Sequence, residues 1–253
     1  MLGIYFSGTG NSKYCVEKFL QEYDTTANSY SIEDSELLKY IHNHEDIVLG
    51  YPVQYSNVPK ILKDFIINNS SLWNGKRIFI IATMALFSGD GSGVLSRIFK
   101  KYGATTVGGL HIKMPDSIGD EKVLKHSLDY NRNLVIKAEN KIKKASKDLK
   151  YGIPPKDGLG FLCHIVGLFG QRLYFINKMN RYTDKLKIND DKCIICGKCI
   201  DLCPMNNLVI KNEMVVSNSQ CTMCYRCVNN CPKQAITLLG KMVVEQSNIE
   251  KYI

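Results

Sequence analysis

Residues 193–204 read CIICGKCIDLCP and residues 221–232 read CTMCYRCVNNCP, so both stretches have the spacing C-x2-C-x2-C-x3-C-P. This spacing is the bacterial pattern in which thiolates hold a [4Fe–4S] cluster and the fourth cysteine ligates the cluster of the other run. The two runs therefore predict two clusters. Their ligands are Cys193, Cys196, Cys199 and Cys231 for one cluster, and Cys203, Cys221, Cys224 and Cys227 for the other.

Zinc and disulfides are the alternatives for these cysteines. Zinc also binds paired C-x2-C units, but a tetrahedral site has no use for the third cysteine or the closing Cys-Pro of each run. Disulfides need an oxidising compartment. The first expected strand begins at Leu2 and leaves no room for a signal peptide, so we expect a cytoplasmic protein. Residues 186–245 resemble a two-cluster bacterial ferredoxin, with an expected hairpin after each cysteine run (208–210 with 214–216, and 235–239 with 242–244).

The first 150 residues alternate strand-like and helix-like segments. Expected strands lie at 2–6, 27–32, 46–51, 76–83 and 105–113, and expected helices at 12–22, 58–67, 92–102 and 121–149. Strands that alternate with helices predict a parallel sheet covered on both faces. In such a doubly wound sheet, ligands bind outside the carboxyl ends of the strands.

The turn after the first strand reads SGTGNS, residues 7–12. Small hydroxyl residues and glycines before a helix offer backbone N–H groups and the positive end of the helix dipole to a phosphate. No lysine follows to balance a polyphosphate, which favours a phosphomonoester. The turn resembles the FMN-phosphate loop of flavodoxins, which implies the sheet order 2-1-3-4-5. The residues expected to hold the phosphate are Ser7, Thr9, Gly10, Asn11 and Ser12. A purely structural strand–helix turn is the alternative.

The same resemblance implies that two later loops hold the isoalloxazine ring. The first is residues 50–57 and the second is residues 83–91, each with an aromatic candidate for a flavin face. The expected contacts are Pro52, Val53, Gln54, Tyr55, Thr83, Phe87 and Gly89. The alternative is that the aromatic side chains only cover the core.

Residues 151–185 match neither part. Gly158–Gly170 is almost wholly apolar, and apolar positions on all sides of a helix predict burial. We expect a connecting and docking segment packed between a flavodoxin-like domain (1–150) and a ferredoxin-like domain (186–253). An interfacial membrane helix and a lid over the flavin are the alternatives.

Together the two parts resemble the fused flavodoxin–ferredoxin proteins of anaerobic bacteria. The resemblance implies FMN, two [4Fe–4S] clusters, and transfer of single electrons between them. The net charge of +9 favours acidic redox partners, whereas the lysines are too dispersed to predict nucleic-acid binding. One alternative is an FMN-dependent reductase of an organic substrate, with Tyr51, Tyr55 and Asp90 as weak candidates for a proton donor. Another is a redox sensor that binds nucleic acid.

Overall fold

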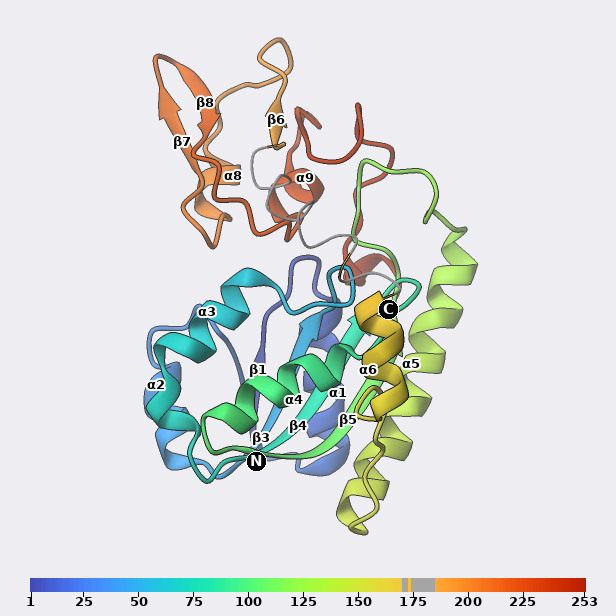
Figure 1. Ribbon diagram of the computed structural model, residues 1–253. Helices are drawn as coiled ribbons and strands as arrows, with labels where there is room; N and C mark the ends of the chain where they lie inside the picture. Colours follow the sequence, from blue (N-terminus) through green and yellow to red (C-terminus); the bar gives the residue numbers. More distant parts are fainter. Residues whose placement is uncertain (170–172, 174–184) are drawn as a thin grey trace.

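The computed structural model describes residues 1–169, 173 and 185–253. Its first part is one five-stranded sheet in the order β2-β1-β3-β4-β5 (Figure 1). Every neighbouring pair of strands is parallel. The strands are β1 (Leu2–Tyr5), β2 (Ser29–Ser31), β3 (Asp46–Pro52), β4 (Arg77–Met84) and β5 (Thr105–Lys113). The predicted sheet and its order are therefore confirmed.

Helices cover both faces of this sheet because alternate strand residues are apolar on both sides. On one face Ile47, Leu49 and Ile80 belong to a buried cluster that also holds apolar residues of helices α2, α3 and α4, whose bounds are given below. On the other face Val48 and Phe79 pack with residues of the first and fifth helices. The helices are α1 (Asn11–Tyr23), α2 (Leu37–Asn43), α3 (Lys60–Asn68), α4 (Gly91–Lys101) and α5 (Leu128–Lys150), with a 3-10 turn η1 (Ser70–Trp73).

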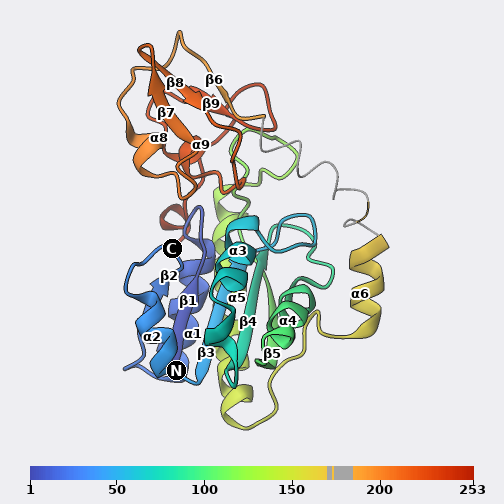
Figure 2. The ribbon, with the colours of Figure 1, turned by 60° about the vertical axis from the view of Figure 1, so that its left-hand side comes forward.

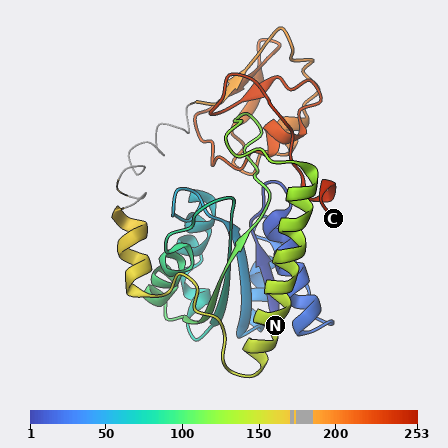
Figure 3. The ribbon, with the colours of Figure 1, turned by 90° about the vertical axis from the view of Figure 1, so that its right-hand side faces the viewer.

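The closing helix begins later than predicted. It was expected from residue 121, but α5 begins at Leu128. The preceding residue, Ser127, caps the helix, because its side chain accepts a hydrogen bond from the Tyr130 backbone N–H at 3.2 Å. Residues 114–127 instead form a loop that reaches toward the C-terminal part (Figure 3). The sequence before Ser127 is therefore used for contact between the two parts of the chain.

The C-terminal part is small and carries its own buried cluster around Val228 and Leu208. The hairpin predicted at 208–216 is confirmed by antiparallel β7 and β8, but the one predicted at 235–244 is wrong. There β9 pairs with β6, which lies before the first cysteine run, instead of with residues 242–244. The elements are β6 (Lys187–Ile188), α8 (Lys198–Asp201), β7 (Leu208–Lys211), β8 (Met214–Ser217), α9 (Arg226–Asn230), β9 (Ile236–Thr237) and η3 (Ile249–Lys251).

The burial predicted for the apolar segment 158–170 is wrong for most of the large apolar side chains of its described residues. Helix α6 (Phe161–Gly167) lies beside α4 at the outside of the first part (Figure 2). Phe161 and Leu162 are 75% and 76% exposed. Residues 170–172 and 174–184 lie outside the described residues, so the docking role of 151–185 and the domain boundaries stay predictions. Among the described residues, no helix is both long and apolar enough to cross a membrane.

Candidate functional site

A cavity of about 270 Å³ lies between the sheet and the C-terminal part, and we call it the interdomain cavity. The carboxyl ends of parallel strands meet at this edge, as the doubly wound arrangement requires. The cavity brings together most of the predicted flavin-binding residues from three separate loops. Those that line it are Ser7, Thr9, Asn11, Ser12, Pro52, Val53, Gln54, Tyr55, Thr83 and Phe87.

The phosphate-loop end of the cavity is formed by the start of α1. Gly10 takes φ 90° and stands before the helix, and no side chain caps the first backbone N–H groups. The Ser12 and Thr83 hydroxyls lie 2.8 Å apart, and the Asn11 side-chain amide donates to the Pro115 carbonyl at 2.7 Å. The Asn11 Oδ1 atom is buried and has no hydrogen-bond partner. Uncapped N–H groups suit a phosphate, and an unpaired acceptor suits a ligand hydroxyl, so the loop fits FMN.

Two predicted contacts, Gly10 and Gly89, are absent from the cavity lining. Gly10 faces away, where an added Cβ would overlap the Ile249 side chain. Gly89 takes φ 57° and lies against the backbone of Gly167 in α6. Both glycines serve turns with left-handed backbone, which a side chain would strain.

The loop after β3 is a tight hairpin turn held by two backbone hydrogen bonds between Gln54 and Asn57. Tyr55 and Ser56, at its tip, have φ 50° and 57°, as a two-residue turn of this kind requires. Tyr55 thereby lines the cavity. The Gln54 amide donates to the carbonyl oxygens of Thr222 and Met223 at 3.0 and 3.2 Å. The loop thus holds both a candidate flavin contact and the C-terminal part.

The two other proton-donor candidates are engaged elsewhere. The buried Tyr51 hydroxyl donates to the Gly91 carbonyl at 2.6 Å. The buried Asp90 carboxylate accepts from Arg97 at 2.6 Å and contacts His164 Nδ1 at 3.0 Å. Neither residue lines the interdomain cavity.

The loop after β5 forms a wall that sequence reasoning missed. Met114, Pro115, Asp116, Ser117, Ile118 and Leu124 line the cavity. Their position after a parallel strand was a usable signal, because every such loop reaches the same sheet edge. Burial raises the pKa of the Asp116 carboxyl, although Lys125 lies 3.4 Å away and opposes the rise. The wall therefore places a carboxyl with a raised pKa beside the predicted flavin site.

The same loop attaches the C-terminal part to the sheet. Asp120 Oδ2 accepts hydrogen bonds from the backbone N–H groups of Leu238 and Leu239 at 2.5 and 3.0 Å. The Gly119 carbonyl accepts from two further backbone N–H groups, of Val244 and Glu245. Near the chain end, the Ile249 N–H donates to the Thr9 carbonyl at 3.0 Å. The C-terminal part is therefore held by the loop after β5 and by the phosphate loop.

The remaining wall of the cavity comes from the second cysteine run. Met223, Cys224 and Tyr225 line it beside the phosphate loop. A Cβ added to Gly8 would overlap the Cys224 carbonyl oxygen, so this glycine permits close approach of the two backbones. Sequence reasoning assigned Cys224 to a cluster but did not place it beside the phosphate loop.

Arg226 strengthens this junction. Its guanidinium donates to the Ser7 carbonyl from two nitrogens, at 3.2 and 2.9 Å, and to both carboxylate oxygens of Glu33, at 2.7 and 2.5 Å. Such bidentate, charge-assisted contacts fix orientation as well as energy. No sequence pattern links Arg226 with Ser7, because the two residues are 219 positions apart.

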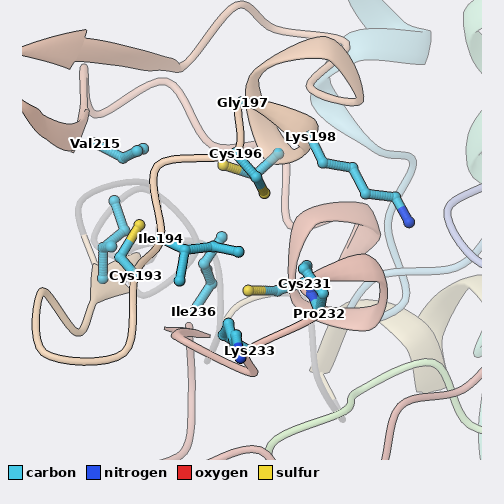
Figure 4. A pocket seen from close by; sticks show the side chains of 12 residues that line it. Cys193, Ile194, Cys196, Gly197, Lys198, Val215, Cys231, Pro232, Lys233 and Ile236 are labelled. Carbon is cyan, nitrogen blue, oxygen red and sulfur yellow. The ribbon is translucent and has the colours of Figure 1, made fainter.

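Each predicted set of four cysteines surrounds a cavity of its own. Cys193, Cys196, Cys199 and Cys231 line the first, which we call the Cys193 cavity. Cys203, Cys221, Cys224 and Cys227 line the second, which we call the Cys221 cavity. Figure 4 shows the side chains of Cys196 and Cys231 approaching the Cys193 cavity from opposite runs. Four thiolates drawn from both runs, in apolar surroundings, fit a [4Fe–4S] cluster.

The thiolate form of these cysteines needs a compensating positive charge. Burial raises the pKa of the Cys224 thiol to about 12, although the Arg226 charge opposes the rise. Burial likewise raises the pKa of Cys227 and Cys221. Buried thiols therefore stay protonated without a compensating cation, and coordinated iron supplies the positive charge that stabilises the thiolates.

Two family models match the chain. Residues 2–105 match the model described as a flavodoxin domain, and residues 185–232 match that of a 4Fe-4S dicluster domain. The chain thus joins a flavodoxin domain to an iron–sulfur domain. This pair of domains matches a fused flavodoxin–ferredoxin protein and supports a redox role in electron transfer with FMN and iron–sulfur clusters.

The chain is also similar to solved flavodoxin structures. Two-electron reduced Megasphaera elsdenii flavodoxin is 19% identical, over 58% of this chain and 99% of that one, with a TM-score of 0.43. Flavodoxin 2 of Bacillus cereus is 16% identical over 59% and 97%, with a TM-score of 0.44. Fusobacterium nucleatum flavodoxin bound to flavin mononucleotide is 17% identical over 59% and 96%, with a TM-score of 0.39. No curated protein matches the chain.

Proposed function

We propose that this protein is an electron carrier that passes single electrons between two [4Fe–4S] clusters and FMN. One observation carries the proposal: Cys224 and Tyr225 line both the interdomain cavity and the Cys221 cavity behind it. FMN in the first cavity would be separated from a cluster in the second by these two residues. When bound, FMN accepts two electrons and each cluster accepts one.

In this proposal, the residues of the chain bind the cofactors and hold them at a fixed distance from each other. The start of α1, Ser12 and Asn11 bind the FMN phosphate and its chain, and Tyr55 contacts the ring. Gln54, Arg226 and Asp120 hold the two parts together through the hydrogen bonds described above, and so keep the distance between cofactors constant. A fixed short distance within one chain removes the need for collision. The redox partners would be acidic proteins, and the cytoplasm stays the predicted location.

Anaerobic reductive titration tests the proposal. Purified protein should contain about eight iron atoms and one FMN per chain, and dithionite should deliver about four electrons per chain. Cys221→Ser and Cys193→Ser remove a ligand from either cavity and give matched variants. If the proposal holds, loss of the Cys221 cluster slows reduction of FMN more than loss of the other. Uptake of only two electrons by the wild type would contradict the proposal.

A further inference from the structure

The two cysteine cavities differ in their access to solvent. In the Cys221 cavity, Cys227 is 9% exposed and Cys224 lies against Gly8 of the phosphate loop. In the Cys193 cavity, the Cys196 side chain is exposed, and its neighbour Ile194 is 56% exposed. Cys203 and Cys221 of the other set are half-buried, so Cys196 is the most exposed cluster ligand among the described residues.

The turn that presents Cys196 is held in an uncommon backbone conformation. Ile195 takes φ 53°, which is rare for a β-branched residue because of steric crowding. Gly197 follows with φ 75°, and α8 begins directly after it. The second cysteine run repeats it at Met223 (φ 55°) and Tyr225 (φ 62°), so this conformation belongs to the loop of both runs, and only its exposure sets the Cys196 turn apart.

The charged side chains that line the Cys193 cavity are positive, and the nearby aspartates lie outside its lining. Both charged residues that line the Cys193 cavity are lysines, Lys198 and Lys233, and both are exposed (Figure 4). Asp190, Asp191 and Lys192 precede the turn, and Asp201 ends α8. An apolar centre of Ile194 and Ile195 with lysines at its edge is the usual anatomy of a protein-binding patch.

We propose that the Cys196 face, consisting of Ile194, Ile195, Cys196, Lys198 and Lys233, is the docking surface for an acidic one-electron redox protein. This inference rests on the proposed function, because it places the entry point of electrons at the cluster farther from FMN. Complementary charge orients the partner and raises the association rate. One electron leaves the partner's reduced centre and reduces the cluster in the Cys193 cavity. No bond forms or breaks in this step, and no proton moves.

An acidic bacterial two-cluster ferredoxin, reduced and freed of excess dithionite, is the probe. The test compares the double variant Lys198→Glu/Lys233→Glu with Lys143→Glu/Lys144→Glu on the exposed side of α5, which changes the net charge by the same amount. The first double variant should lower the second-order rate about tenfold at low ionic strength and flatten its salt dependence, and the second should not. Equal iron content and visible spectra check that the clusters are intact.

Zero-length carbodiimide cross-linking gives a readout that does not depend on electron flow. The oxidised probe and wild-type protein should link at Lys198 or Lys233, as mapped by mass spectrometry. Links mainly on α5, equal slowing by both double variants, or no reaction with the probe would each overturn the inference. Failure of the proposed function is distinguishable, because the wild type would then take up only two electrons per chain in the dithionite titration, whereas the cross-links and the effect of the lysine variants do not depend on that number.

Discussion

At the scale of single residues, the closest approach of the two domains depends on an absent side chain. Gly8 lies so near the Cys224 carbonyl that even a methyl group cannot fit without displacement of backbone. Sequence reasoning gave this glycine a role in binding phosphate, and the structure adds a role in bringing a cluster ligand to the phosphate loop. Contacts of this kind connect distant positions and leave no local signal.

Gly8→Ala should therefore separate the domains. Overpacking at such a contact costs about 1–3 kcal/mol, so we expect a lower free energy of unfolding and weaker FMN binding. Denaturant unfolding and FMN fluorescence titration measure the two effects. Gly160→Ala is the control, since an added Cβ there meets open space. Equal stability of the two variants would show that the close approach at Gly8 does not constrain the domains.

His111 should make the flavodoxin domain sensitive to acid. Burial lowers its pKa to about 4, with Asp157, Lys141 and Asp90 as the charged groups nearby. An unfolded histidine takes up a proton near pH 6.5. Between these values the unfolded state binds more protons, so the free energy of unfolding falls as the pH decreases. Between pH 6.5 and 5 the loss should be about 2 kcal/mol.

Denaturant unfolding monitored by Trp73, the single tryptophan and fully buried, measures this loss. His111→Gln should remove most of the pH dependence in that window, whereas His42→Gln, at an exposed position, should not. A wild-type stability that stays constant from pH 6.5 to 5 would mean that His111 takes up a proton in the folded protein.

At the scale of elements, the strands were predictable and the connections between domains were not. The segment 76–83 is rich in β-branched and aromatic residues, and β4 forms there with a shift of one residue. The cluster ligands were predictable because cysteine spacing reflects cluster geometry. In contrast, the role of residues 114–127 depends on partners such as Leu238, more than a hundred positions away. Local periodicity carries no information about such pairing.

Helix α6 shows that burial, too, cannot be predicted from local composition alone. Its composition predicts a core helix, yet Leu162 is 76% exposed, whereas Leu95 of α4 is fully buried. Leu162→Ala should change the free energy of unfolding by less than about 0.5 kcal/mol, because exposed substitutions have small effects. Leu95→Ala should cost about 2–5 kcal/mol through lost burial and a residual cavity. Denaturant unfolding of both variants measures the two changes. Similar losses of unfolding free energy in Leu162→Ala and Leu95→Ala would mean that α6 is buried.

At the scale of the whole molecule, residues of both domains line one cavity. Met223, Cys224 and Tyr225 of the iron–sulfur domain complete the interdomain cavity, and Arg226 holds the Ser7 carbonyl. A small domain with few buried residues depends on its metal for folding. Assembly of the clusters should therefore precede tight binding of FMN.

Iron removal tests this order. Anaerobic chelation should unfold residues 186–253, remove one wall of the cavity, and weaken FMN binding about tenfold or more, which corresponds to about 1.4 kcal/mol. FMN fluorescence titration before and after chelation measures the change, and Trp73 fluorescence checks that the flavodoxin domain stays folded. Cys193→Ser, which perturbs the cavity farther from the flavin, should weaken FMN less than Cys221→Ser. Unchanged FMN affinity after complete loss of iron would mean that the sheet edge alone binds the flavin, because the shared wall would then contribute no binding energy.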